Sequence, residues 1–246
     1  VSIITPCYNA APFISQAIES VLAQSFGDWE MIIVDDCSSD DSLLIIQEYA
    51  RIDSRIRYLR TDNSSGSPTL PRNMGIKEAK GRYIAFLDSD DIWLPNKLSD
   101  QLKVFEKSEV AIVFSNYEKV NLDGERSGRE IIAPCEVDYP LLLKGNCIGC
   151  LTAMYDSALT GKIFFKEIGH EDYVCWLSIL KQGYKARNTN TVTALYRVSD
   201  HSVSSNKLKA MRWQWNILRN EMDLPVYKAV YYFIHYAIRA FAKAMR

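Results

Sequence analysis

Short apolar segments alternate with helical patterns through the first half of this 246-residue chain, and this alternation constrains the fold most strongly. The apolar segments predict strands at residues 2–6, 30–35, 55–60, 82–87 and 110–114. Between them, apolar residues recur at helical spacing in residues 12–24, 42–49, 71–80 and 95–107. Strands that alternate with helices in this way form βαβ units with parallel neighbouring strands. The sequence therefore predicts an α/β fold with a mainly parallel sheet.

After residue 114 the helical spacing of apolar residues weakens, and short strand-like segments predominate. Short segments at residues 117–121, 151–155 and 191–198 predict strands of a mixed or antiparallel region, and residues 171–180 predict a helix. We therefore divide the chain into a first half at 1–114, a substrate-side half of the same domain at 115–205, and a C-terminal helical extension at 206–246.

Composition narrows the classes of function. Hydrophobic residues make up 48% and charged residues 24%, and the net charge of −1 gives no indication of nucleic-acid binding. No segment has the length of a membrane span, and no signal peptide is visible. The six cysteines are scattered, which is typical of reduced thiols in the cytoplasm. Cys147 and Cys150 form a lone CxxC without a second pair, so core packing is favoured over zinc.

One predicted strand ends in an unusual concentration of negative charge. Asp88, Asp90 and Asp91 directly follow residues 82–87. Like charges this close are unfavourable unless a cation neutralises them. Mg²⁺ and Mn²⁺ prefer such oxygen ligands and commonly complete their shell with substrate phosphates. The pattern indicates a metal–diphosphate site, and the alternative is a solvated acidic turn before the helix after Pro95.

Three predicted strands end in residues that can contact a ligand. These residues are Thr5, the pair Asp35 and Asp36, and the acidic segment 88–91. Because ligands of parallel α/β sheets bind at the carboxyl ends of strands, we expect all three strand ends to face one crevice.

The C-terminal segment after Pro225 predicts an amphipathic helix. One side carries the basic residues Lys228, Arg239, Lys243 and Arg246; the other carries Val230, Phe233, Ile234, Ala237, Ile238 and Phe241. Such a helix either lies on an anionic membrane surface or packs on the domain with a solvated basic face, and both interpretations stay open here.

Five short motifs in order carry a family resemblance. They are the segments 4–9 (ITPCYN), 33–40 (IVDDCSSD), 71–75 (PRNMG), 87–91 (LDSDD) and 169–172 (GHED). Over residues 1 to about 205 the chain resembles the family 2 glycosyltransferases of GT-A fold. The resemblance implies a Rossmann-like three-layer α/β/α domain with a mixed, mainly parallel sheet. It also implies an inverting, metal-dependent transferase that uses a nucleotide-diphospho-sugar, for which we expect UDP.

The resemblance assigns donor-binding roles to the first strand ends. Thr5, Pro6, Tyr8 and Asp36, with Asp35 adjacent, would hold the nucleobase. A tyrosine ring can stack on a base and a carboxylate can accept the uracil N–H, so the chemistry fits. A helix-capping cluster is the alternative for the two aspartates.

The segment Asp88-Ser89-Asp90 resembles the family's DxD motif. The resemblance implies that Asp90 is the chief ligand of Mn²⁺ or Mg²⁺ and that Asp88 contacts the metal or the ribose. Arg72 and Asn73 would reach the diphosphate or the donor sugar, unless Arg72 is an ordinary surface arginine. His201 would contact the metal or diphosphate, unless it is simply exposed in a polar loop.

Glu171 and Asp172 resemble the family's catalytic pair. Asp172 would be the general base that takes the proton of the acceptor hydroxyl, and Glu171 would position the acceptor or the base. A metal would offset the charge that develops on the leaving diphosphate. The alternative for this pair is a helix cap.

The QxxRW signature of processive relatives is missing, which indicates transfer of one sugar per encounter. By resemblance, the acceptor is a bacterial surface glycan or its lipid-linked precursor, reached from the cytoplasmic leaflet of the membrane. Peripheral membrane contact would then come from the C-terminal helix. No nucleic-acid partner is expected.

Other classes fit less well. A dinucleotide-dependent dehydrogenase needs GxGxxG after its first strand, whereas residues 5–9 contain no glycine. A receiver domain would not account for Asp90 or Asp172. A sugar-1-phosphate nucleotidyltransferase needs a glycine-rich N-terminal loop, which is missing. A catalytically silent relative that binds nucleotide sugars stays open as an alternative.

Overall fold

The computed structural model describes residues 1–105, 109–198 and 207–244. The first half contains β1 (Ser2–Cys7), α1 (Ile14–Leu22), β2 (Glu30–Asp35), α2 (Ser42–Ile52), β3 (Ile56–Arg60), α3 (Thr69–Glu78), β4 (Tyr83–Phe86), β5 (Ile92–Trp93) and α4 (Lys97–Phe105). The second half contains β6 (Val110–Val120), β7 (Arg126–Ile131), β8 (Glu136–Val137), α5 (Tyr139–Leu142), the 3₁₀ turn η1 (Cys150–Thr152), β9 (Met154–Asp156), α6 (Ser157–Thr160), α7 (Glu171–Leu180) and β10 (Lys185–Arg197). The chain continues through α8 (Lys207–Asn216), a π-helical segment η3 (Ile217–Glu221) and α9 (Val226–Ala244).

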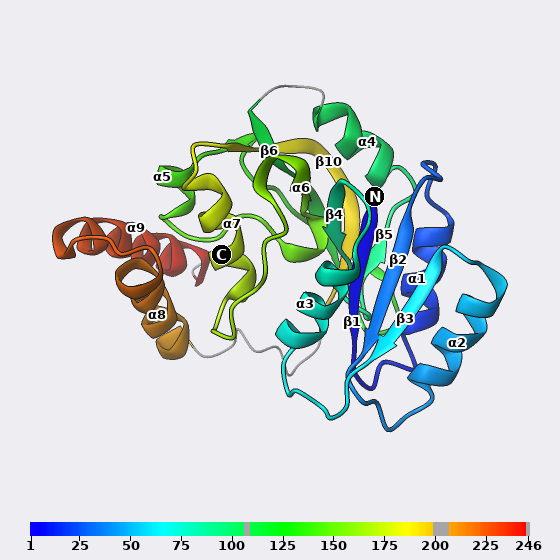
Figure 1. Ribbon diagram of the computed structural model, residues 1–246. Helices are drawn as coiled ribbons and strands as arrows, with labels where there is room; N and C mark the ends of the chain where they lie inside the picture. The colour runs from blue at the N-terminus through cyan, green and yellow to red at the C-terminus, as the bar shows by residue number, and fades with distance from the viewer. Residues whose placement is uncertain (106–108, 199–206, 245–246) are drawn as a thin grey trace.

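One mixed sheet organises the molecule (Figure 1). Its strand order is β3-β2-β1-β4-β9-β6-β10-β5, with β7 paired to β6 and β8 paired to β10. The strands β3, β2, β1 and β4 run parallel to one another, as do β6 and β10. β9 runs antiparallel to both β4 and β6, so it joins the two parallel groups. The predicted α/β class with a mixed, mainly parallel sheet is confirmed.

Alternating side chains of the strands supply two separate cores, one on each face of the sheet. On one face, Ile3 packs in a cluster with Ile14 of α1 and Leu98 of α4. On the other, Ile4 packs in a cluster with Ile76 of α3 and Trp176 of α7. Helices therefore cover both faces, as the predicted three-layer α/β/α arrangement requires.

The predicted strands at 110–114 and 117–121 are one continuous strand, β6. The polar residues Ser115 and Asn116 interrupt the apolar pattern in the middle of this segment, so the sequence suggested two separate strands. In the structure both are buried and hydrogen-bonded. The Asn188 side chain donates to Asn116 Oδ1 over 2.8 Å, and the Thr193 hydroxyl donates to Ser115 Oγ over 2.6 Å. Both partners lie on β10, so pairing with a distant strand satisfies polar groups that the local pattern marks as a loop.

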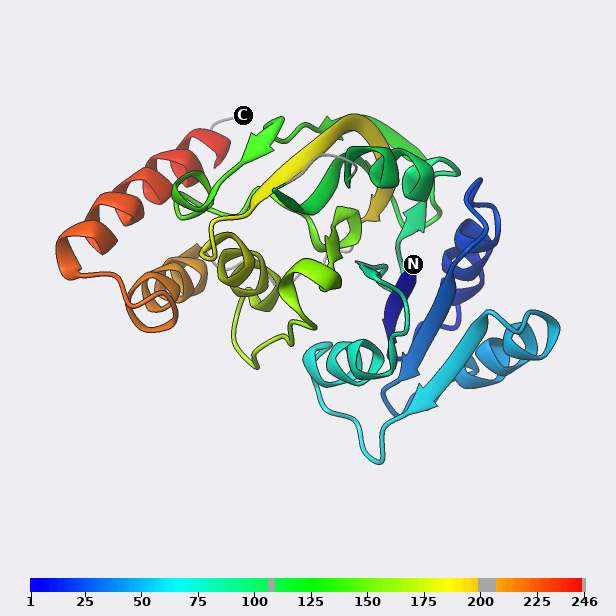
Figure 2. The same ribbon diagram turned by 45° about the horizontal axis from the view of Figure 1, so that its top comes forward.

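The C-terminal helices α8 and α9 pack beside each other and beside α7, at the end of the molecule farthest from α1 and α2 (Figures 1 and 2). In the described residues, no helix combines the length and apolar character that crossing a bilayer requires. The two CxxC thiols, Cys147 and Cys150, are free and pack against the larger core, as predicted.

Candidate active site

The carboxyl ends of β1, β2 and β4 meet at one pocket of 340 Å³, as the sequence predicted. Its lining comprises Pro6, Cys7, Tyr8, Asp36, Gly66, Ser67, Pro68, Pro71, Arg72, Asp88, Ser89 and Asp90. Tyr8 is 55% exposed, so its ring is available to a ligand. We call this cavity the donor pocket.

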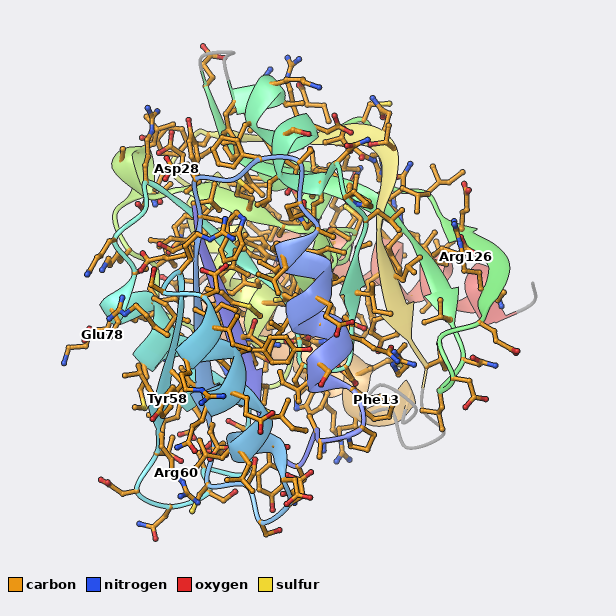
Figure 3. All side chains as sticks on the ribbon, turned by 90° about the vertical axis from the view of Figure 1, so that its right-hand side faces the viewer. Phe13, Asp28, Tyr58, Arg60, Glu78 and Arg126 are labelled. Carbon is orange, nitrogen blue, oxygen red and sulfur yellow. The ribbon has the colours of Figure 1, made fainter. Side chains whose placement is uncertain are left out.

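Neighbouring groups fix the orientation of the two aspartates that follow β2. Asp36 is nearly buried, and it accepts hydrogen bonds from the Thr61 hydroxyl over 2.9 Å and from the Ser65 amide over 2.9 Å. Asp35 lies fully buried behind the pocket, with its Oδ2 atom 3.2 Å from Nε of Arg60. Arg60 stands at the end of the edge strand β3, close to Tyr58 (Figure 3). Asp36 therefore faces the pocket, whereas Asp35 supports the turn.

Two other predicted donor-binding residues do not line the donor pocket. Thr5 is fully buried, and its hydroxyl has no hydrogen-bond partner among the described residues. The Asn73 side chain donates to the Phe165 carbonyl over 2.9 Å and accepts from the Phe165 amide over 2.8 Å. Since both ends of its amide are occupied, Asn73 connects α3 to the segment before α7 and is not aimed at the donor pocket.

Arg72 bridges the two predicted functional clusters. Its guanidinium lies 2.6 Å from Asp88 in the donor pocket and 2.8 Å from Glu171 at the start of α7. The side chain is only 5% exposed, so the surface alternative for Arg72 is wrong. Despite burial, the nearby Asp88 and Glu171 carboxylates raise the pKa of Arg72, which stays charged. Its Nε atom is buried and has no partner within residues 1–105, 109–198 and 207–244.

The acidic segment after β4 is held from behind by Arg197 at the end of β10. The Arg197 amide donates to Asp91 over 2.9 Å, and its side chain donates to the Asp90 carbonyl over 2.8 Å. The same guanidinium stacks 4.7 Å from the ring of Phe13, at the start of α1 (Figure 3). Arg197 therefore fixes the backbone of the acidic segment, a structural role that spacing along the chain did not predict.

The carboxylates of the acidic segment repel one another. Burial, together with the neighbouring Asp88, raises the pKa of Asp90. The pKa of Asp91 is raised well above its ordinary value by the same causes, and its buried Oδ2 atom has no partner in the part of the chain that the structure describes. Within the described residues, no three His, Cys, Asp or Glu side chains form a ready-made metal cluster. Asp88 and Asp90 are the pair that could hold a divalent cation together with phosphate oxygens, since a cation would relieve their repulsion.

A second pocket of 500 Å³ adjoins the first and shares Gly66, Ser67 and Pro68 with it. We call it the acceptor-side pocket. Its remaining lining residues are Thr69, Glu167, Ile168, Gly169, His170, Glu171, Asp172, Lys209 and Trp213. Glu171 and Asp172, which the sequence predicted to be a catalytic pair, line this pocket, whereas the sequence analysis did not single out the two α8 residues Lys209 and Trp213. The only signal for them was their aromatic and basic character in a segment without a matching motif.

Asp172 stands in the first turn of α7. His170 precedes it in a left-handed backbone conformation with φ 61° and ψ 47°, which turns the chain into the helix. Burial, with the charge of Glu171, raises the pKa of Asp172 to about 6. Its Oδ2 atom accepts a hydrogen bond from the Asn146 side chain over 3.1 Å, an orienting contact that the sequence did not predict. His201 lies outside the described residues.

Comparison with known proteins identifies the family. The sequence pattern described as "Glycosyl transferase family 2" matches residues 2–168. The putative teichuronic acid biosynthesis glycosyltransferase TuaG of Bacillus subtilis (strain 168) is 42% identical over 100% of this chain and 97% of that protein. The Escherichia coli protein WfgD, named UDP-Glc:alpha-D-GlcNAc-diphosphoundecaprenol beta-1,3-glucosyltransferase, is 40% identical over 97% of this chain and 92% of that protein.

Solved structures agree on the fold. S. aureus TarS residues 1–349 in complex with UDP-GlcNAc matches with a TM-score of 0.74 and 22% identity, over 98% of this chain and 72% of that chain. The mannosyltransferase PcManGT from Pyrobaculum calidifontis, in complex with GDP-Man and Mn²⁺, matches with a TM-score of 0.68 and 15% identity, over 99% of this chain and 74% of that chain. The chain therefore belongs to glycosyl transferase family 2, the inverting glycosyltransferases of GT-A fold.

Proposed function

We propose that this protein transfers a sugar from a UDP-sugar to a hydroxyl group of a lipid-linked glycan, one sugar per encounter, in bacterial surface polysaccharide synthesis. The observation that carries the proposal is the Arg72 bridge, which joins Asp88 of the donor pocket to Glu171 beside the expected base Asp172. A donor and an acceptor bound in the two adjoining pockets would meet at this bridge.

The donor pocket has the chemistry that a nucleoside diphosphate needs. Tyr8 offers an aromatic face to the base, and Asp36 offers acceptor oxygens to its N–H. The complex of the neighbour TarS with UDP-GlcNAc supports a UDP-sugar as donor. Asp88 and Asp90 would hold Mn²⁺ or Mg²⁺, and the complex of the neighbour PcManGT with GDP-Man and Mn²⁺ supports this assignment. When bound, such an ion offsets the charge that develops on the leaving diphosphate.

Asp172 would act as the general base. A pKa of about 6 keeps the carboxylate charged at neutral pH, and it makes the group a stronger base than an ordinary aspartate. As the acceptor oxygen attacks the anomeric carbon, Asp172 takes the hydroxyl proton and the bond to the diphosphate breaks. One displacement inverts the anomeric centre. Glu171, held by Arg72 over 2.8 Å, would orient the acceptor hydroxyl.

The names of the relatives support a lipid-linked acceptor. WfgD of Escherichia coli is named for GlcNAc-diphosphoundecaprenol, and a Campylobacter jejuni relative at 29% identity is named for a diphosphoundecaprenol-linked glycan. Such acceptors lie in a membrane, and we assign this chain to the cytoplasmic leaflet.

Helix α9 supports peripheral contact with that leaflet. An apolar stripe of Tyr227, Tyr231, Ile234 and Ile238 is between 51% and 71% exposed. The exposed basic residues Lys228 and Arg239 lie beside the stripe. The opposite side of α9 packs on the domain, where Ala229 is fully buried. The stripe would enter the interface while the basic side chains meet anionic headgroups. The side chain of Lys243 and residue Arg246 lie outside the described part.

The test is a panel of nucleotide sugars incubated with Mn²⁺ and a GlcNAc-diphospho-lipid of short chain. We expect one UDP-sugar to give a β-linked product from its α-configured donor, as measured by proton NMR coupling constants. Asp172→Asn should lower kcat by about 10²–10⁴-fold without changing Mn²⁺-dependent UDP binding. If the unaltered protein binds UDP but transfers no sugar, the alternative of a catalytically silent protein that only binds nucleotide sugars would be favoured. Formation of a UDP-sugar from UTP and a sugar 1-phosphate would favour the nucleotidyltransferase.

A further inference from the structure

The acceptor-side pocket has a wall that comes from outside the region matched by the family pattern. That pattern ends at residue 168, whereas Gly169, Trp213 and Lys209 line the pocket beyond it. The donor pocket, in contrast, is built entirely from residues 6–90. The part of the pocket wall on α8 therefore lies outside the region that the family pattern describes.

Trp213 packs against two neighbouring residues in that wall. Its ring meets the ring of His170 edge-on at 5.0 Å. A Cβ atom at Gly169 would lie 2.1 Å from Cε2 of Trp213, so the indole rests directly on the glycine backbone. A fixed aromatic surface beside two catalytic carboxylates suits the apolar C–H face of a sugar ring, whose hydroxyls can then reach the carboxylates.

Lys209 lies one helical turn before Trp213, with Nζ 4.7 Å from the indole ring. Among the described residues that line this pocket, the other charged side chains are the carboxylates of Glu167, Glu171 and Asp172. Among the pocket-lining residues that the structure describes, Lys209 is the only lysine or arginine. An ammonium group can pair with a phosphate attached to a sugar through a charge-assisted hydrogen bond.

We propose that Trp213 and Lys209 determine acceptor specificity. Trp213 forms the platform on which the acceptor sugar stacks, and Lys209 pairs with the phosphate that joins this sugar to its lipid. This assignment rests on the proposed transfer to a lipid-linked glycan. It predicts that the enzyme selects a sugar bearing an anomeric phosphate over the same sugar without one.

The platform is tested with Trp213→Leu. The KM for the GlcNAc-diphospho-lipid should rise about tenfold, which corresponds to about 1.4 kcal/mol of lost stacking. The KM for the UDP-sugar and its slow hydrolysis without acceptor should not change. The matched control is Trp215→Leu, because Trp215 lies on the same helix but faces Phe233 at 5.5 Å, away from the pocket. Equal effects of both substitutions, or no effect of Trp213→Leu, would overturn the platform.

The phosphate contact is tested with Lys209→Met on two soluble acceptors, a GlcNAc-diphospho-alkyl compound and a neutral alkyl GlcNAc. The kcat/KM should fall about tenfold for the first and stay unchanged for the second. Arg212→Met is the control, since Arg212 is an exposed cation of α8 that lines a different cavity. Equal losses on both acceptors would overturn the assignment. Failure of the unaltered protein to transfer any sugar would instead contradict the proposed function.

Discussion

At the scale of single residues, the burial of Asp172 raises the pKa of its carboxyl group and should therefore determine how the reaction rate depends on pH. Because the pKa of its carboxyl is raised to about 6, we expect kcat/KM to fall as the pH decreases below about 6, where the proposed base becomes protonated. One proton should account for the acid limb of the profile. Initial rates between pH 4.5 and about 8.5 at saturating Mn²⁺ measure it. An acid limb near the ordinary aspartate value, about 3.9, would contradict the assignment.

Arg72 gives a second prediction at this scale. Arg72→Met would leave Asp88 and Glu171 partly buried without their cation. The free energy of unfolding should fall by about 2–4 kcal/mol, because removing one partner of a buried ion pair is costly. Urea unfolding measures the change. Lys103→Met is the control, since the Lys103 side chain is 71% exposed and pairs with Asp100 on the surface, where such a pair contributes less than about 1 kcal/mol. Similar losses of unfolding free energy in both variants would contradict a stabilising role for the Arg72 ion pairs.

The residue scale also marks where prediction from sequence ends. Asp36, Asp88, Asp90 and Asp172 were placed at pockets correctly, because strand ends and helix starts fix where a side chain begins. The direction of Asn73 was not predictable, because its partner is the Phe165 backbone, which lies 92 positions further along the chain. Trp213 belongs to neither a strand end nor a known motif, so only the tertiary structure identifies it.

At the scale of elements, the packing of α3 on β1 determines how closely Arg72 approaches the acidic segment. A Cβ atom at Gly75 would lie 2.6 Å from Cγ2 of Ile4. Gly75→Ala should therefore reduce the free energy of unfolding by about 1–3 kcal/mol through overpacking. Urea unfolding measures the loss. Gly27→Ala should be nearly neutral, since no atom lies within 4 Å of its Cβ position. Equal stability of both variants would contradict the close approach.

The elements themselves were predicted unevenly. Strands β1, β2 and β4 of the first half were found because their apolar runs are buried almost continuously, whereas the two-residue strand β5 was not predicted. The second half was harder, because buried polar residues of β6 are satisfied only by β10. The hairpin strand β7 is exposed along most of its length, so it lacks the apolar alternation that marks a strand.

At the scale of the whole molecule, α9 predicts reversible binding to anionic membranes. The protein should sediment with phosphatidylglycerol vesicles at low salt, and a triple variant Tyr231→Ser, Ile234→Ser, Ile238→Ser should lose most of this binding. Added salt should weaken the binding, because Lys228 and Arg239 supply its electrostatic part. Vesicles of neutral phosphatidylcholine are the control. Unchanged sedimentation of the triple variant would contradict contact through the stripe.

The two pockets differ in how firmly they are built into the molecule. Arg72 ties the donor side to the start of α7 by charge, so a change on either side disturbs the other. The indole of Trp213 instead packs on Gly169 and His170 without an ion pair, on a helix at the periphery. Under the proposed role of α8, substitutions in this helix should change which glycan is extended and leave the reaction of the nucleotide sugar intact. Related bacteria could then make different surface polysaccharides through amino-acid substitutions in this one helix.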